Sequence, residues 1–145
     1  MIETKESTAD VCWPLLQKLW PDKAVILPID NTLGKIRWTG RQYSNIKVRY
    51  WLATYNDRPI ACTTAYQTWN DELRIRGTYC DPEFRRTGAA ASCVNAALKA
   101  FDNIRLAYTF PRMGVEGFYQ SLGFTIGPER WPNIYKGVAY AWKSL

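Results

Sequence analysis

The fold of this chain is decided by the stretch Cys80-Asp81-Pro82-Glu83-Phe84-Arg85-Arg86-Thr87-Gly88-Ala89-Ala90. Before it, from 72 to 80, apolar and polar side chains alternate with the two-residue period of a strand. After it, Val94, Leu98 and Phe101 recur at the spacing of an apolar helix face. The pattern therefore predicts a strand, a tight turn and a helix in succession.

The alternation assigns each residue of the predicted strand to a face. One face is expected to be apolar and to carry Leu73, Ile75, Gly77 and Tyr79. Gly77 is also a candidate β-bulge, because a glycine inside a strand often marks one.

The turn is suited to an anion. The first amides of a helix have no partner within the helix, and the helix dipole is positive at that end. Gly88 leaves the backbone bare and Ala90 adds only a methyl group. We therefore predict that main-chain amides hold a phosphate here, while the turn alone also allows a plain strand-to-helix connection.

Two motifs carry a resemblance to a known family. The pattern Arg85-x-x-Gly88-x-Ala90 resembles the acetyl-CoA-binding motif of the GNAT N-acetyltransferase superfamily, which reads Arg or Gln, two residues, Gly, one residue, Gly or Ala. Downstream, Tyr119-x-x-x-Gly123-Phe124 is similar to the segment that joins the fourth helix of that superfamily to a following strand. The resemblance implies a single GNAT-like domain over residues 1–145, of the α+β class, with a mixed, mostly antiparallel sheet flanked by helices.

The local signals along the chain agree with that order of elements. Strands are expected at 2–5, 47–55, 60–69, 72–80, 104–110, 124–126 and 136–142, and helices over 11–19, 91–101 and 114–122. Gly123 is a natural C-cap for the last helix. Residues 22–45 give only weak signals, and the resemblance implies a helix or loop there that faces the acceptor.

Composition and charge bound the function. The chain has 145 residues, is 47% hydrophobic and carries a formal net charge of +6, which suits one packed domain that attracts anions. Coenzyme A would be a sufficient partner, and nucleic acid would be another. The N-terminus lacks a signal-peptide pattern and no apolar run is long enough to span a membrane, so we expect a cytoplasmic protein with no membrane partner.

Cysteine and histidine usage excludes several chemistries. The sequence contains no histidine, and its four cysteines are scattered without a Cys-x-x-Cys pair. A Cys-His or Ser-His dyad is therefore excluded, and we expect no metal site. An enzyme built from this chain must use Tyr, carboxylates, Lys, backbone groups and water.

The resemblance implies roles for particular residues. Tyr119 stands where the family's general acid stands, and a phenol of pKa about 10 can protonate a thiolate whose conjugate pKa is about 8.5. The residue set that would bind the coenzyme consists of backbone at Thr78, Tyr79 and Cys80 for the pantetheine arm, and Arg85, Arg86, Thr87, Gly88, Ala89 and Ala90 for the pyrophosphate. Arg112 replaces an Asn that contacts the coenzyme in many relatives, so it is expected to reach a phosphate or the acceptor, or to signal lost activity.

The general base is less clear from the sequence. An acceptor amine is mostly protonated at neutral pH, so a carboxylate or a water relay would help. Glu72, at the start of the strand before the turn, is the first candidate, with Asp71 and Glu116 behind it. Each of these can equally be a surface carboxylate, and Tyr119 can equally be a core aromatic residue.

The function expected from the resemblance is an acyltransferase that moves an acetyl group from acetyl-CoA to a primary amine, small molecule or protein, by direct attack. A homodimer is left open. Two alternatives remain: a GNAT-fold interaction protein with weak or no catalysis, and a basic nucleic-acid-binding module. The second rests on cations interleaved with aromatic residues over 35–43 and 47–51.

Overall fold

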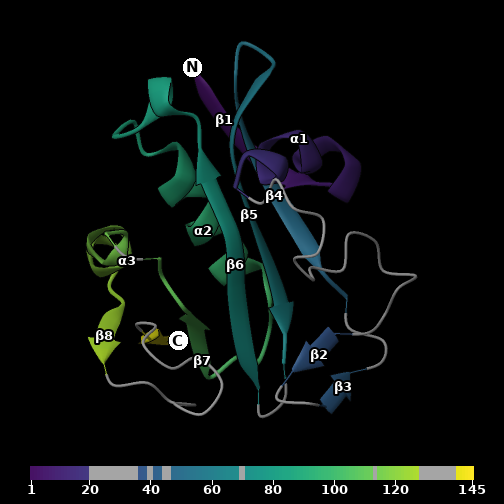
Figure 1. Cartoon of the computed structure of the whole chain (residues 1–145), viewed down its shortest axis with the longest axis vertical. Coiled ribbons are helices and arrows are strands. Elements are labelled where there is room, and N and C mark those ends of the chain that lie inside the picture. The colour runs from purple at the N-terminus through teal and green to yellow at the C-terminus, as the bar shows by residue number, and fades with distance from the viewer. Residues whose placement is uncertain (20–35, 39–40, 44–46, 69–70, 113, 128–139) are drawn as a thin grey trace.

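A mixed sheet of seven strands, in the order β1-β4-β5-β6-β7-β9-β8, forms the centre of the molecule (Figure 1). The computed structural model describes residues 1–19, 36–38, 41–43, 47–68, 71–112, 114–127 and 140–145. The strands of this sheet are β1 (Ile2–Ser7), β4 (Arg49–Tyr55), β5 (Arg58–Gln67), β6 (Glu72–Cys80), β7 (Leu106–Thr109), β8 (Thr125–Gly127) and β9 (Tyr140–Ser144). Among the described strands, only β6 and β7 pair in parallel, which confirms the expected mixed, mostly antiparallel sheet.

Most element bounds agree with the sequence to within a few residues. The strand predicted over 72–80 has those bounds, and the predicted helices correspond to α1 (Ala9–Leu19), α2 (Ala89–Ala100) and α3 (Glu116–Ser121). The structure differs from the expectation within 22–45, where the sequence signals are weak and the resemblance implies a helix or loop. There, β2 (Ile36–Trp38) and β3 (Arg41–Tyr43) pair as a separate antiparallel hairpin. The rest of 22–45, and residues 136–139 of the last predicted strand, lie outside the described residues.

Helices cover both faces of the sheet. The face that carries α2 and α3 is packed by small and aliphatic side chains, including Cys93, Val94 and Ala97 of α2 against Ala65 and Ile75 of the sheet. On the other face, a second cluster joins α1 to β4 and β5 through a set of apolar side chains: Cys12, Leu15, Leu16, Tyr50, Leu52, Cys62 and Tyr66. No helix in the described part of the chain combines the length and apolar character that crossing a membrane requires.

A β-bulge interrupts β6 at Gly77. Cys62 of β5 faces Tyr79, but Thr64 faces Arg76, so one extra residue lies on the β6 side. Gly77 has a φ of +68°, a left-handed conformation that glycine adopts without strain. The bulge predicted at Gly77 is therefore confirmed.

The bulge also corrects the expected faces of β6. Leu73 and Ile75 lie in the α2–α3 cluster as predicted, but beyond Gly77 the alternation is reversed. Tyr79 packs against the α1 cluster, while Cys80 packs against the α2–α3 cluster. The prediction that Tyr79 shares a face with Leu73 was wrong, because a bulge adds a residue to the two-residue period.

The parallel pair β6 and β7 separates part of the way along. Their register runs only from Glu72 with Leu106 to Arg74 with Tyr108. Figure 1 shows β6 running along the molecule, with β7 beside only its first part. The second half of β6, from Ile75 to Cys80, consequently has no strand paired on its β7 side within the described residues.

Candidate active site

The turn that joins β6 to α2 has an unusual backbone. Asp81 leads into a short 3-10 helix, η1 (Pro82–Phe84), and α2 begins at Ala89. Arg86 has a φ of +66° and Gly88 a φ of +86°. A left-handed residue other than glycine costs about 1–2 kcal/mol, so the conformation at Arg86 is strained. Strained backbone in an ordered turn is a feature of ligand sites.

The first amides of α2 precede the hydrogen-bond ladder of the helix. The first bond of the α-helical ladder is donated by the Ser92 N–H to the Gly88 carbonyl over 2.9 Å. The amides ahead of Ser92 have no place in that ladder. One of them, the Ala90 N–H, donates to the Cys80 thiol.

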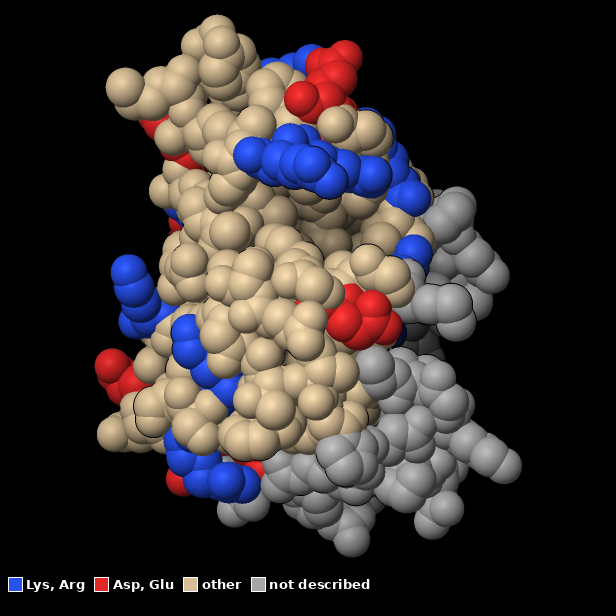
Figure 2. Space-filling model, turned by 90° about the vertical axis from the view of Figure 1, so that its left-hand side faces the viewer, with Lys and Arg blue, Asp and Glu red and all other residues tan. Residues whose placement is uncertain are grey.

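The surface above this turn is open and basic. A Cβ atom added at Gly88 would meet no heavy atom within 4 Å. Arg85 and Arg86 are exposed. Figure 2 presents the side of the molecule on which Figure 1 draws α3 and the turn before α2, and a band of Lys and Arg side chains crosses the upper part of this face above a hollow. The turn therefore offers helix-terminal amides, positive charge and space to an anion.

Tyr119 approaches β6 beyond the point where β6 and β7 separate. It lies on α3, and its ring packs edge-on against Phe118 and Phe124, with centroids 5.0 and 5.4 Å away. The side chain is only 5% exposed. Its hydroxyl donates a hydrogen bond to the Thr78 hydroxyl over 3.2 Å and is also hydrogen-bonded to Thr109 of β7. A phenol is thus held between the diverging strands.

The electrostatics keep this phenol protonated. Burial raises the pKa of the Tyr119 hydroxyl, while hydrogen bonds to Thr78 and Thr109 and the positive charge of Arg74 act in the opposite direction. Thr78 in turn shares a hydrogen bond of 2.7 Å with the hydroxyl of Thr63 on β5. The result is a chain of hydroxyl groups from α3 across β6 to β5.

The structure brings most of the predicted site residues together. Thr78, Tyr79 and Cys80 form the end of β6, and Arg85, Arg86, Thr87, Gly88, Ala89 and Ala90 form the turn and the first residues of α2. Tyr119 meets this group through its bond to Thr78.

Glu72 lies elsewhere. It starts β6 six residues before Thr78, about 20 Å away at the usual rise of a strand. Its side chain is buried, and its carboxylate forms an ion pair of 2.5 Å with the half-exposed Arg105. Its role as a base stays a prediction that the geometry does not support, because an ion-paired carboxylate at the far end of the strand is out of reach of Tyr119.

Arg112 also takes a different position. Its guanidinium donates to the carbonyl of Leu19, the last residue of α1, over 3.0 Å. A cation at the C-terminus of a helix is favoured by the helix dipole and by the unpaired carbonyls there. Arg112 thus points toward the helix on the opposite face of the sheet from α2, and its printed bond does not reach the turn between β6 and α2.

The basic and aromatic segment has little of the character of a nucleic-acid surface where it is described. Tyr50 and Trp51 are 4% and 3% exposed and belong to the core. Arg49 binds Glu6 through two hydrogen bonds of 2.7 and 2.8 Å and lies over the ring of Phe101. Lys35, 39–40 and 44–46 lie outside the described residues.

Cysteine and metal chemistry find no support in the described ranges. Burial raises the pKa of the Cys12 thiol to about 11 and that of Cys93 to about 12, and it also raises that of Cys62. Burial raises the pKa of Cys80 as well, although the charge of Arg85 opposes it. Within the same ranges, no group of three or more His, Cys, Asp or Glu side chains is placed to hold a metal.

Three residues at this site carry no motif by which the sequence could mark them. Thr63 and Thr109 complete the hydroxyl chain, and Arg58 contacts Asp81, which precedes the turn between β6 and α2. Thr63 and Thr109 reach the site only through pairing of distant strands, and no motif marks them. Arg58 lies just ahead of the strand expected at 60–69, although it is the first residue of β5 in the structure, and no motif marks it either.

Comparison with known proteins identifies the family. Residues 7–124 match the Acetyltransferase (GNAT) family. Similar solved structures include an IAA acetyltransferase from Bacillus cereus (11% identity, TM-score 0.72, 100% of both chains covered) and a PaiA N-acetyltransferase from Thermoplasma acidophilum in complex with coenzyme A (11% identity, TM-score 0.71, 100% of this chain and 99% of that one). A GNAT family acetyltransferase from Elizabethkingia anophelis with acetyl-CoA bound has 18% identity and a TM-score of 0.67, over 99% of this chain and 98% of that one.

Those structures establish the likeness of the fold. No curated protein is similar enough in sequence to count as a match. The family match extends over both motifs that the sequence offered, the turn at Gly88 and the segment from Tyr119 to Phe124. The chain belongs to the GNAT acetyltransferase family and is an acyltransferase.

Proposed function

We propose that this protein transfers an acetyl group from acetyl-CoA to a primary amine by direct attack, with Tyr119 as the general acid. The observation that carries the proposal is the position of the Tyr119 hydroxyl, bonded to Thr78 beside the unpaired half of β6. An acyl transfer from a thioester needs a proton at that place, where the sulfur departs.

The residues of the turn fit the coenzyme. Acetyl-CoA, when bound, supplies an acetyl group that is already activated as a thioester. The amides of Gly88 and Ala89, at the positive end of α2, would bind its diphosphate, and the exposed Arg85 and Arg86 would add charge. The open space over Gly88 and the strained turn support this assignment. The solved relatives with coenzyme A or acetyl-CoA bound support it independently.

The second half of β6 would position the reacting group. Backbone amides from Thr78 to Cys80 on its unpaired side can pair with the extended arm of the coenzyme, as another strand would. One of these amides would stabilise the negative charge that develops on the carbonyl oxygen.

The proton balance uses a single protein group. A bond forms between the amine nitrogen of the acceptor and the carbonyl carbon, and the bond between that carbon and sulfur breaks. The Tyr119 hydroxyl gives its proton to the departing thiolate, and the proton lost by the nitrogen passes to solvent, from which Tyr119 is protonated again. Burial raises the pKa of Tyr119, so the hydroxyl holds its proton until the thiolate forms.

Two measurements test the proposal. Calorimetric titration with coenzyme A is expected to give saturable binding, while a single-stranded oligonucleotide of similar charge is expected to bind weakly or not at all. Thiol release from acetyl-CoA is then followed with a panel of primary amines. Binding of coenzyme A without thiol release for any amine would favour the interaction protein, and binding of the oligonucleotide alone would overturn the assignment.

A further inference from the structure

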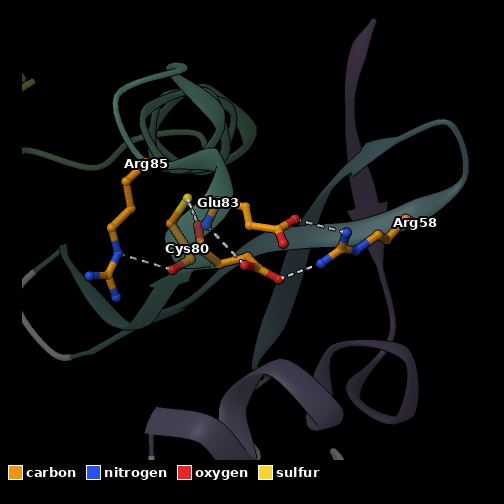
Figure 3. A network of polar contacts seen from close by, with 5 residues as sticks. Arg58, Cys80, Glu83 and Arg85 are labelled. Carbon is orange, nitrogen blue, oxygen red and sulfur yellow. Dashed lines mark hydrogen bonds and ion pairs between the residues drawn. The ribbon is translucent and has the colours of Figure 1, made fainter.

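A network of charged side chains joins the β4–β5 hairpin to residues 81–84 (Figure 3). These residues precede the coenzyme turn, the part of the β6–α2 connection at 85–88. Its centre is Arg58, the first residue of β5. The preceding residues Asn56 and Asp57 have φ values of +47° and +66°, the left-handed pair typical of a two-residue hairpin. The hairpin thereby fixes Arg58 opposite Tyr55 at the end of the sheet.

The two terminal nitrogens of Arg58 bind two carboxylates. One nitrogen lies 3.0 Å from Oδ2 of Asp81, and the other lies 3.2 Å from Oε2 of Glu83. Asp81 is 7% exposed, and its other oxygen, Oδ1, accepts from the Glu83 N–H at the start of η1 over 3.2 Å. Arg58 therefore holds both the residue that caps η1 and a residue within it.

An aromatic contact reinforces the same connection. The Arg58 guanidinium lies 5.4 Å from the ring centroid of Phe84. The ring centroids of Tyr55 and Phe84 are 5.3 Å apart. The carbonyl of Phe84 accepts hydrogen bonds from both the N–H and the hydroxyl of Thr87. Thr87 lies between the two left-handed residues, Arg86 and Gly88. A continuous series of contacts thus leads from Arg58 to the strained part of the turn.

A strained turn keeps its conformation only where its surroundings over-determine it. We propose that Arg58 is a positioning residue of the coenzyme site: by holding Asp81, Glu83 and Phe84, it keeps the amides of the turn in the arrangement that binds the diphosphate. Arg58 acts through these residues and does not touch the coenzyme. The inference rests on the proposed function, since it concerns affinity for coenzyme A.

The experiment compares three variants with the wild type by calorimetric titration with coenzyme A. Arg58→Gln removes the charge, Arg58→Lys keeps it, and Arg49→Gln is the matched control. Arg49 also joins a carboxylate, Glu6, to aromatic rings, those of Trp51 and Phe101, at a strand start in the same sheet. Its contacts do not include the coenzyme turn.

We expect Arg58→Gln to raise the dissociation constant about three- to tenfold, the size of effect that one or two weak ion pairs have on an equilibrium. Arg58→Lys is expected to be intermediate, and Arg49→Gln to bind as the wild type does even though it melts at a lower temperature. Hydrogen exchange of the amides of 85–91 is expected to be faster in Arg58→Gln than in Arg49→Gln.

The outcomes separate the two proposals. If wild-type protein fails to bind coenzyme A, the proposed function falls, and this inference falls with it. If the wild type binds but both Arg58 variants bind equally well, or Arg49→Gln loses as much affinity, only the positioning role is overturned. Should Arg58→Gln fail to fold, Arg58→Lys decides, because it keeps a cation against both carboxylates but loses the paired geometry of the guanidinium.

Discussion

The hydroxyl of Tyr119 donates its hydrogen bond to the hydroxyl of Thr78, 41 residues away in sequence and 3.2 Å away in space. This bond joins α3 to β6 beyond the last paired residues of β6 and β7. It therefore connects the proposed acid with the strand that would hold the thioester, and several consequences can be measured.

Tyr119→Phe is expected to lower kcat about 100-fold, the scale of a lost general acid. Affinity for coenzyme A should stay within about twofold, because the main-chain amides that would hold the diphosphate are unchanged. Steady-state thiol release and calorimetry measure the two quantities.

The matched control for that variant is Tyr66→Phe. Tyr66 is also a buried tyrosine, and its hydroxyl has no hydrogen-bond partner among the residues that the structure describes. Its loss should leave kcat unchanged and should not lower the melting temperature. Equal rates for Tyr119→Phe and the wild type would remove Tyr119 from the mechanism.

Thr78→Val keeps the shape of the side chain but removes the acceptor of the Tyr119 hydrogen bond. We expect a lower kcat, since the phenol loses a group that orients it and that would stabilise its charged form. Thr64→Val is the comparison, because Thr64 is fully buried, more so than Thr78, but its hydroxyl donates to the carbonyl of Arg76 instead. A loss of rate in Thr64→Val as large as in Thr78→Val would mean that general destabilisation, and not the phenol, explains the effect.

Gly88→Ala is expected to weaken coenzyme A binding. Alanine at a φ of +86° is strained by about 1 kcal/mol, and the added methyl would enter the space in which the diphosphate is proposed to lie. Gly123→Ala carries the same backbone strain at a φ of +89°, at the end of α3. Both variants should melt at lower temperature, but only Gly88→Ala should raise the dissociation constant.

Glu72→Gln separates a structural role from a catalytic one. The buried carboxylate pairs with the half-exposed Arg105, so removing either partner should cost less than the about 3–5 kcal/mol of a fully buried ion pair. We expect Glu72→Gln and Arg105→Gln both to lower the melting temperature and to leave the pH dependence of kcat unchanged. A large loss of kcat in Glu72→Gln alone would restore Glu72 as the base.

The ion pair between Glu6 and Arg49 should make stability depend on pH in acid. The hydrogen bond from Arg49 lowers the pKa of the Glu6 carboxyl from its ordinary 4.5. A carboxyl whose folded pKa is lowered stabilises the fold above its unfolded pKa, and this contribution is lost as the pH falls through the folded pKa.

Arg49→Gln is therefore expected to reduce the free energy of unfolding at neutral pH, by up to about 1 kcal/mol for this partly exposed pair. The difference from the wild type should shrink in acid below the Glu6 pKa, to the part that the ring contacts of Arg49 contribute. Urea unfolding of both proteins, at neutral pH and at a pH below the Glu6 pKa, measures this difference in the free energy of unfolding. A difference that does not change with pH would show that the carboxylate contributes nothing.

Short-range signals in the sequence predicted much of this site. The bounds of β6, the bulge at Gly77, the helix after Gly88 and the left-handed glycine that ends α3, Gly123, all depend on residues close to one another in the chain. Side-chain size and backbone freedom are read directly from residue type, so these features could be predicted.

The partners of charged side chains could not be predicted in the same way. Glu72 finds Arg105 across 33 residues, and Arg112 finds the end of α1 across 93. Both contacts depend on how the strands and helices are arranged in space, and local periodicity carries no information about that arrangement. For this reason a predicted base proved to be ion-paired, and a predicted coenzyme contact proved to cap a helix.

The extra residue at Gly77 reverses which side chains of β6, odd-numbered or even-numbered, face α2. Before it, odd-numbered side chains such as Ile75 face α2; after it, even-numbered side chains such as Cys80 do. When β6 is aligned with a strand that lacks the bulge, positions after Gly77 must therefore be shifted by one residue for side chains on the same face to correspond. Deleting Gly77 would remove the extra residue and restore a single phase in which Leu73, Ile75, Thr78 and Cys80 share the α2 face. Thr78 would then keep the face from which it now meets Tyr119, without the bulge.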